Sequence, residues 1–423
     1  RRGRAEPLYR ANWPQRLGWY GGAHRAQLAL ARTDAAAAQA PLVWVHAVSL
    51  GETLAARPLV AALRAQWPGM RLLLTHSTAT GREAGEALLQ GSDVQTWLPY
   101  DTPGAVRRFL RAHNPNLGVL METEIWPNVQ REAARLGLPM VLANARLSAK
   151  SLRQGQRFAA LLRPAAESLA LALAQSTDDA ERLTQAGVRQ VQVCGNVKFD
   201  LNPEPELVSR GQRWAELSGR PIILGAVTRE GEEVDLLDDW VTHHAAWHGL
   251  PFDHAHLPRL MIVPRHPQRF DEVAQAVVSK GLTLSRRSAW PQGMPDEAAL
   301  AADVWLGDSM GEMPAYYAAS KVALLGGSFA PLGGQNLIEA AACGCPVVMG
   351  PHTFNFAQAA ELSMAAGAAV RVQTFTEALN QADDIIRTER QPDMAEAALE
   401  FAQRHRGAAQ RMARALGQFW RSC

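Results

Sequence analysis

The residues best suited to chemistry lie where expected strands run into helices. The stretch Gly326–Phe356 holds one such junction, in which an apolar run (322–325) enters a glycine-rich loop and a helix follows. Glycines 333 and 334 let a phosphate or sugar approach the main chain, where a helix N-terminus offers unpaired N–H groups. Asn336 and Glu339, three residues apart, are expected on one helical face with a shared ligand. Their carboxylate suits a ribose or sugar diol, whereas a merely structural glycine turn is the alternative.

Glu52 is a second candidate, because it follows the first expected strand in the segment HAVSLGE (46–52). A carboxylate at this position can take a proton from an attacking hydroxyl group, provided that its pKa is tuned toward the operating pH. The alternative is a first-turn glutamate whose charge favours the helix dipole. This segment alone leaves both readings open.

Two carboxylates with one residue between them, Glu122 and Glu124, follow the fourth expected strand in METEIWPN (121–128). The spacing resembles an acid-x-acid metal motif, yet no Asp-x-Asp pair occurs elsewhere in the chain. If the strand continues, the two side chains point to opposite sides. We therefore expect Glu122 to face the ligand and Glu124 to bind the main chain or an arginine.

Cationic side chains at further junctions suit an anionic ligand. Lys198, in GNVKFD (195–200), can neutralise charge on a departing phosphate, or can form a structural salt bridge. Arg265 follows Pro264 at another strand end, and its planar fork of donors suits phosphate or carboxylate. The loop at 307–314 precedes a further helix, and its amides are expected to hold a base or a phosphate.

Composition limits the function classes. The 423 residues suffice for two ordinary domains, and the net charge of +2 gives no reason to expect nucleic acid. Four cysteines without paired spacing favour a reducing compartment and no disulfide framework. Cys343 and Cys345 are expected to be small core residues. The histidines between 243 and 256 fit no standard ligand set, so we expect a solvated, loop-like insertion and no metal.

The N-terminal segment is basic and aromatic, although no run approaches the ~20 apolar residues of a membrane-spanning helix. Six arginines stand against Glu6 in the first 25 residues, interleaved with aromatic side chains. Such a segment is attracted to an anionic membrane surface, and a solvated arm is the alternative. The residues in question are Arg1, Arg2, Arg4, Arg10, Arg16 and Arg25 with Trp13, Trp19 and Tyr20.

Strand-like and helical stretches alternate along the chain, which predicts doubly wound α/β sheets with right-handed crossovers. The proline-containing segment 200–206 interrupts the alternation and reads as a linker. We therefore expect two Rossmann-like domains, 1–201 and 202–423, with the ligand crevice between them and closing helices after 393. The expected strands are 43–48, 72–76, 94–98, 117–121, 140–143, 169–174, 191–194, 222–226, 260–263, 304–306, 322–325, 347–349 and 369–372.

Several motifs fall in one order over nearly the whole chain: HAVSLGE, HSTATGRE, METEIWPN, NARLS, GNVKFD, VPRHP, GDSMGEM and GGQNLIEAAACGCPVVMGP. Together they resemble the 3-deoxy-D-manno-oct-2-ulosonic acid (Kdo) transferases of Gram-negative bacteria, which are GT-B glycosyltransferases. The resemblance implies inverting transfer of Kdo from CMP-Kdo to the lipid A precursor, without a cofactor or metal. It also implies the cytoplasmic face of the inner membrane, usually with an N-terminal hydrophobic anchor, which we expect to be absent from this chain.

The resemblance also implies roles for individual residues. Glu52 matches the general base, while Glu122 and Lys198 match positions that stabilise the transition state. Residues 1–201 would bind the acceptor and 202–423 the CMP-sugar. The CMP-binding positions would be Pro264, Arg265, Met310, Gly311, Glu312, Asn336, Leu337, Ile338 and Glu339.

One segment departs from the family pattern. Residues 225–230 read GAVTRE where family members often carry a Ser-Thr-His-Glu type of turn, so a donor contact there is in doubt. Two other functions stay open: a GT-B enzyme acting on a UDP-sugar, either a transferase or a 2-epimerase, and a non-enzymatic nucleotide-sugar binding module. No motif encodes how many Kdo residues are added.

Overall fold

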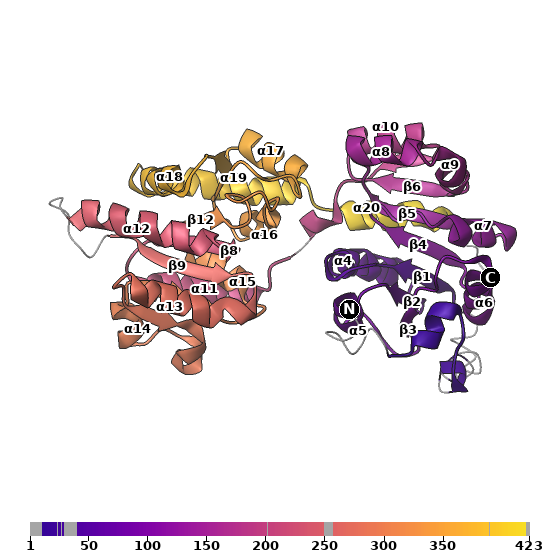
Figure 1. Cartoon of the computed structure of the whole chain (residues 1–423), viewed down its shortest axis with the longest axis horizontal. Helices are drawn as coiled ribbons and strands as arrows, with labels where there is room; N and C mark the ends of the chain where they lie inside the picture. Colours follow the sequence, from indigo (N-terminus) through magenta and orange to yellow (C-terminus); the bar gives the residue numbers. More distant parts are fainter. Residues whose placement is uncertain are drawn as a thin grey trace. The chain divides into compact units, whose positions relative to one another are not determined.

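The computed structural model describes residues 11–22, 24–26, 28, 40–200, 202–248, 257–388 and 390–419, with the side chains of 244–248 left aside. The chain divides into two compact units (Figure 1). Unit 1 comprises Arg1–Asp200 with His405–Cys423, and unit 2 comprises Leu201–Arg404. Each unit is a parallel α/β sheet covered by helices.

Seven parallel strands in the order β3-β2-β1-β4-β5-β6-β7 form the sheet of unit 1. Trp44 pairs with Leu73 on one side and Gly118 on the other, so the strand order reverses at β1. Loops at the carboxyl ends of strands meet at such a switch point. The strands are β1 (Leu42–His46), β2 (Arg71–His76), β3 (Val94–Trp97), β4 (Leu117–Met121), β5 (Met140–Ala145), β6 (Leu171–Ala174) and β7 (Val191–Val193).

Both faces of this sheet are buried, because successive side chains alternate between two cores. Val43 and Val45 pack against α4 and α20, whereas Trp44 packs on the opposite face against Phe109 of α6. The helices are α4 (Leu50–Gln66), α5 (Ala79–Glu86), α6 (Pro103–His113), α7 (Pro127–Arg135), α8 (Ala149–Gln156), α9 (Ala159–Glu167), α10 (Thr177–Ala186) and α20 (Ala408–Leu416), with 3₁₀ turns η2 (Trp13–Leu17), η3 (Val197–Asp200) and η8 (Gly417–Phe419).

The last helix, α20, belongs to unit 1, which corrects the prediction that 202–423 forms one domain. Met412 and Leu416 lie in the same core as Leu59 of α4. The carboxylate of Asp200 accepts hydrogen bonds from the main-chain N–H groups of Gly407 and Ala409, the latter at 2.5 Å. Because these N–H groups open α20, Asp200 caps a helix more than 200 residues away in sequence.

Unit 2 repeats the plan with seven parallel strands in the order β10-β11-β9-β8-β12-β13-β14. Here the order reverses at β8, which pairs with β9 and β12. Strand β10 was not among the expected strands, because its three residues are only half-buried and form no apolar run. The strands are β8 (Ile222–Thr228), β9 (Arg259–Pro264), β10 (Leu284–Arg286), β11 (Val304–Leu306), β12 (Val322–Leu325), β13 (Val347–Met349) and β14 (Ala369–Arg371).

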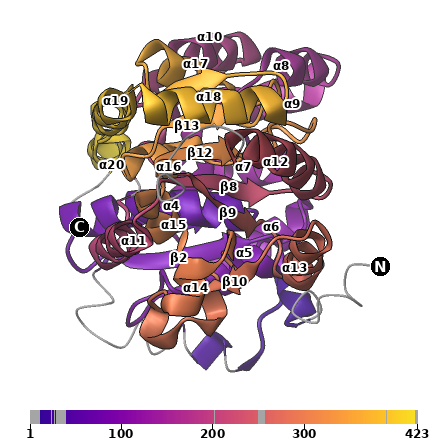
Figure 2. The same cartoon turned by 90° about the vertical axis from the view of Figure 1, so that its left-hand side faces the viewer.

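Helices cover both faces of the second sheet, and α18 packs across β12 and β13 (Figure 2). They are α11 (Pro205–Ser218), α12 (Glu232–His248), α13 (Phe270–Ser279), α14 (Glu297–Ala301), α15 (Met313–Ala319), α16 (Leu337–Ala342), α17 (Ala357–Ala365), α18 (Phe375–Arg387) and α19 (Arg390–Arg404), with 3₁₀ turns η5 (Pro267–Arg269), η6 (Arg287–Ala289) and η7 (Pro291–Gly293).

The histidine-rich stretch is partly helical, so the expectation of a loop is corrected. His243, His244 and His248 lie in α12, whose buried Leu236 and Trp240 anchor it on the sheet. His254 and His256 lie outside the described residues. Cys345 is buried and Cys343 half-buried, which agrees with their predicted packing role.

The basic N-terminal segment is partly packed on unit 1. Arg16 is buried, lies over the Trp97 ring at 4.2 Å and donates to the Ser77 carbonyl oxygen. The prediction that Arg16 contacts a membrane is therefore wrong, because its side chain is buried. The side chains of Trp13 and Trp19 are exposed. Arg1, Arg2, Arg4 and Arg10 lie outside the described residues. No helix in the described ranges is long and apolar enough to cross a membrane.

Candidate active site

Glu52 lies at the start of α4, at the carboxyl end of β1. Ser49 caps this helix, since its hydroxyl oxygen accepts from the Glu52 N–H at 3.4 Å. In return the Glu52 carboxylate accepts from the Val48 N–H at 2.8 Å and from the Ser49 hydroxyl at 3.3 Å. The sequence Ser49-Leu-Gly-Glu52 thus forms a variant of the capping box, in which the carboxylate binds the N–H of the residue before the cap and is held in one place.

The protonation of Glu52 is tuned toward neutral pH. Burial raises its pKa to about 7; the hydrogen bond from Val48 opposes this shift, and the charges of Glu124 and Glu122 add to it. A carboxyl group with this pKa can exchange a proton with a hydroxyl group near neutral pH. The geometry is therefore compatible with both interpretations that the sequence leaves open, a glutamate that supports the helix start and a base.

Two buried histidines behind Glu52 were not anticipated. The ring nitrogen Nδ1 of His76 lies 3.0 Å from the Ala47 carbonyl oxygen, and that of His46 lies 2.9 Å from the Thr75 hydroxyl. Burial lowers the pKa of His46 to about 3 and that of His76 to about 4. Both rings are therefore neutral at pH 7. His76 holds the main chain at Ala47, whereas His46 links β1 to β2 through Thr75. In sequence each residue simply ends an apolar strand and gives no sign of this contact.

Glu122 and Lys198 form an ion pair at the same sheet edge, with Nζ and Oε1 3.3 Å apart. Glu122 has a left-handed main chain (φ 59°), which is uncommon for a residue with a side chain and turns the chain sharply after β4. Asn144 on the neighbouring β5 is left-handed too (φ 52°), and its side chain accepts from the Val197 N–H at 3.2 Å. Asn144 thus positions the turn that carries Lys198, a role that the sequence did not reveal.

Glu124 is not held as expected. Within the described chain, no arginine and no main-chain N–H group binds its carboxylate, and burial raises its pKa. Its charge acts on Glu52 together with that of Glu122, so three carboxyl groups share this edge of unit 1.

In unit 2, a buried carboxylate organises the glycine-rich loop after β12. Glu232 is 2% exposed and accepts four main-chain hydrogen bonds. Its oxygens lie 2.7 Å from the Gly327 nitrogen, 2.9 Å from that of Arg229, 3.2 Å from that of Phe329 and 3.3 Å from that of Ala330. In sequence, Glu232 appears only as an acidic residue at a helix start, because three of its four partners lie 95 to 98 residues away.

The glycines of this loop are required by close packing as well as by conformation. Gly333 and Gly334 have left-handed main chains (φ 91° and 75°). A Cβ atom at Gly333 would lie 2.4 Å from the Asn355 amide nitrogen, so the loop presses directly on the segment after β13. Gly333 is therefore needed for the structure of the turn, as the alternative interpretation of the sequence held, whether or not it also contacts a ligand.

The residues of segment 336–339 have different structural roles from those expected. Asn336 precedes α16 and caps it, with its side-chain oxygen 3.2 Å from the Ile338 nitrogen. Leu337 and Ile338 are buried core residues, so only their main chain is available to a ligand. The expected shared helical face of Asn336 and Glu339 is corrected, since Asn336 lies outside the helix. Burial raises the pKa of Glu339, which the charge of Arg265 opposes.

Two arginines without an ion pair in the described chain lie close to this loop. Arg265 follows Pro264 at the end of β9, and its N–H donates to the Thr228 carbonyl oxygen at 2.9 Å. Arg229 follows β8, and its Cγ lies 3.6 Å from the position of a Cβ on Gly327. Val227, near the end of β8, is left-handed (φ 56°), a strained state for a β-branched residue. The departure from the family pattern thus places a cation, Arg229, beside the loop.

In the segment 310–312, one side chain is held by ion pairs and the other two residues are accessible. Glu312 accepts from Arg210 and Arg287, each at 2.8 Å, and from the Ser309 hydroxyl. Burial would raise the pKa of Glu312, but these partners lower it, so its side chain is a charged anchor. Met310 is 66% exposed and Gly311 is left-handed (φ 81°), which leaves these two residues open to a ligand. In the described ranges, no group of three or more potential ligand side chains could hold a metal ion.

Comparisons with known proteins identify relatives of this chain. A family model described as 3-Deoxy-D-manno-octulosonic-acid transferase (kdotransferase) matches residues 11–201. The chain is 47% identical over 419 residues to 3-deoxy-D-manno-octulosonic acid transferase of Bordetella pertussis, covering 96% of this chain and 94% of that protein. It is 32% identical to the enzyme of the same name from Haemophilus influenzae, covering 96% and 91%.

Solved structures of low identity confirm the GT-B-like fold. Anabaena HepE in complex with UDP aligns with a TM-score of 0.57 and 15% identity, over 89% of this chain and 100% of that chain. Staphylococcus aureus MnaA with UDP aligns with a TM-score of 0.56 and 13% identity, over 90% and 96%. Because its sequence is 47% and 32% identical to two of these enzymes over 96% of its length, the chain belongs to the 3-deoxy-D-manno-octulosonic acid (Kdo) transferase family of glycosyltransferases.

Proposed function

We propose that this chain transfers Kdo from CMP-Kdo to a lipid A precursor, with inversion at the anomeric carbon. The observation that carries the proposal is the carboxyl group of Glu52, held by a capping box and given a pKa of about 7. A hydroxyl nucleophile needs such a base, and a binding module does not.

In this reaction Glu52 removes the proton from the acceptor hydroxyl group as its oxygen attacks the anomeric carbon of Kdo. A new carbon–oxygen bond forms, while the bond between that carbon and the phosphate oxygen of CMP breaks. The bonding electrons leave with CMP, and the proton stays on Glu52. A single displacement of this kind inverts the anomeric configuration.

Charge develops on the leaving phosphate, and preorganised cations are the means to stabilise it. Arg265 and Arg229 in unit 2 make no ion pair in the described chain, and Lys198 in unit 1 is held by Glu122. A monophosphate leaving group develops less charge than a diphosphate, so these cations and main-chain amides suffice in our proposal without a metal. The nucleotide would meet the 326–336 loop, the 310–311 turn and Glu339.

The proposed acceptor carries phosphates and acyl chains, and we propose that the reaction takes place at the cytoplasmic face of the inner membrane. Support comes from the basic composition of the N-terminal segment and from the exposed Trp13 and Trp19. Arg16 is excluded from this contact by its burial.

Mass spectrometry of products tests the proposal. The purified chain is incubated with CMP-Kdo and a lipid A precursor in detergent, with UDP-N-acetylglucosamine as the donor control. We expect mass increments of whole Kdo residues on the acceptor only with CMP-Kdo, and their number reports how many residues are added. Transfer or epimerisation of the UDP-sugar, with no Kdo product, would overturn the assignment.

A further inference from the structure

Helices α8 and α9 form a largely exposed hairpin in unit 1. From Ala149 to Glu167 only Leu152, Ala165 and Ala166 are buried. Large apolar side chains lie in the open: Phe158 is 65% exposed and Leu161 is 60% exposed. Apolar side chains scattered singly are ordinary on a protein surface, but two of them three residues apart are notable when grooves adjoin them.

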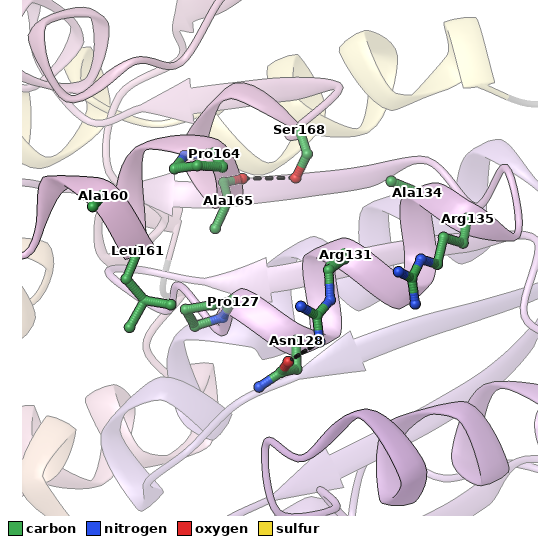
Figure 3. A pocket seen from close by; sticks show the side chains of 10 residues that line it. All are labelled: Pro127, Asn128, Arg131, Ala134, Arg135, Ala160, Leu161, Pro164, Ala165 and Ser168. Carbon is green, nitrogen blue, oxygen red and sulfur yellow. Dashed lines mark hydrogen bonds between the residues drawn. The ribbon is translucent and has the colours of Figure 1, made fainter.

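Helix α9 stands between two mainly apolar grooves. The first, of about 550 Å³, separates it from α7; Leu161, Pro164 and Ala165 face Pro127 and Arg131 across it (Figure 3). The second, of about 410 Å³, lies between α8, α9 and the loop after β4. Thr123 and Ile125 line this second groove, which therefore reaches the loop that begins with Glu122.

The charge of the hairpin is one-sided. No aspartate or glutamate occurs between Glu132 and Glu167, whereas six basic residues do. Four of these, Arg146, Lys150, Arg153 and Arg157, are exposed and make no ion pair in the described chain. Lys150 and Arg153 lie three residues apart on one side of α8, and Arg157, the C-cap residue of that helix, follows four residues later. By contrast, Arg135 on α7 is paired with Glu132 at 2.7 Å.

We propose that this hairpin docks unit 1 onto an anionic lipid bilayer, with Phe158 and Leu161 in the interfacial layer and the four cations against headgroup phosphates. Exposed apolar residues beside unpaired cations are the combination that anionic bilayers bind. The proposal rests on the proposed function in one respect: a lipid acceptor would be taken from this layer, and an acyl chain in the second groove would lie beside the Glu122 loop.

Co-sedimentation with phospholipid vesicles tests the inference. The vesicles contain phosphatidylglycerol and phosphatidylethanolamine, with phosphatidylcholine vesicles as the neutral control and no Kdo acceptor or donor present. The triple variant Lys150→Gln, Arg153→Gln, Arg157→Gln should lose roughly 100-fold in affinity for anionic vesicles, because each basic residue contributes about 1 kcal/mol near such a surface. The variant Phe158→Ser, Leu161→Ser should weaken binding at high salt, where electrostatic attraction is screened.

Matched variants control for net charge and surface polarity. Replacing Arg213, Lys321 and Arg414 with Gln removes the same charge at other exposed positions, and Val278→Ser removes an exposed apolar side chain. These variants should bind vesicles as the parent does. Equal losses in the control and hairpin variants, or full binding by both hairpin variants, would overturn the proposal. Loss of all binding on replacing Arg1, Arg2, Arg4 and Arg10 alone would likewise assign docking to the N-terminal segment.

Activity separates this inference from the proposed function. The hairpin variants should transfer Kdo normally to acceptor dispersed in detergent, and poorly to acceptor embedded in anionic vesicles. If the parent transfers no Kdo in detergent, the proposed function fails while the vesicle result still stands. If the parent transfers Kdo but the hairpin variants do so equally well in vesicles, the docking surface fails alone.

Discussion

At the scale of single residues, Glu52 is subject to opposing influences. The hydrogen bonds from Val48 and Ser49 favour its charged form, whereas burial and the neighbouring carboxylates favour the neutral form. The balance leaves a base that is strong enough to accept a proton yet is half-deprotonated near neutral pH. A fully exposed carboxylate in the same capping box would be a weaker base.

We expect Glu52→Gln to fold normally and lose about 100- to 10,000-fold in transfer rate, because general base catalysis typically contributes this much. Glutamine keeps the shape and a side-chain oxygen for the capping box. In the parent, kcat/KM should fall as the pH drops below about 7, because protonated Glu52 cannot act as a base. Activity within a few-fold of the parent at pH 7 would contradict the assignment.

The same pKa predicts a change in stability with pH. The folded protein holds the Glu52 proton up to about pH 7, whereas an unfolded glutamate releases it near pH 4.5. Deprotonation therefore destabilises the fold as the pH rises through this window. We expect Glu52→Gln to be more stable than the parent at pH 8 and to lose that advantage at pH 4, as measured by urea unfolding at each pH.

Donor binding should depend on Arg265 and Arg229, which lie near the glycine-rich loop and make no ion pair with the described residues. CMP binds the folded state and so should raise the melting temperature, UMP should do so less and NAD not at all. Arg265→Ala, Arg229→Gln and Glu339→Ala should each reduce the shift by CMP, whereas Arg213→Gln on α11 should not. A larger shift with UDP than with CMP would show that the donor is a UDP-sugar.

At the scale of elements, the strands could be predicted because parallel strands are buried on both faces and read as apolar runs. Strand β10 was not predicted, because its residues are only half-buried and form no apolar run. The end of α12 was predicted to be a loop, because it is rich in histidine. Candidate residues such as Glu52 and Glu122 could be located because each follows a strand end. Asn144, Glu232 and the two histidines could not, since their roles depend on partners that are distant in sequence.

The Asp200 cap of α20 offers a test of one such distant contact. Asp200→Ala leaves two main-chain N–H groups at the helix start without their acceptor, and loss of a cap typically costs about 1 kcal/mol. We expect a lower melting temperature and faster hydrogen exchange in α20 and in the α4 surface beneath it. Asp200→Asn keeps an acceptor oxygen and should restore most of the loss. Unchanged exchange in α20 would argue against the cap.

At the scale of the whole molecule, each unit brings a different part of the proposed reaction: three carboxyl groups and Lys198 in unit 1, and arginines beside a glycine-rich loop in unit 2. Neither set includes a cluster suited to a metal in the described ranges. In our proposal, the cations that stabilise the leaving phosphate are fixed side chains.

Transfer should accordingly survive EDTA. The expected result is an unchanged rate after chelation and dialysis, because Lys198, Arg229 and Arg265 stabilise the leaving phosphate in our proposal. The control is a metal-dependent glycosyltransferase treated in parallel. A rate that falls with EDTA and returns with Mg²⁺ would instead implicate Glu122 and Glu124 as ligands.

The return of α20 to unit 1 has a consequence for biosynthesis. While the ribosome makes unit 2, the surface of Leu59 and Leu63 that α20 covers stays open. At 5–20 residues per second, this interval is about 10–40 s. Unit 2, being continuous in sequence, can fold first, whereas unit 1 is completed only after α20 has been made. A nascent chain that stalls before α20 would therefore expose an apolar surface, to which chaperones would be expected to bind.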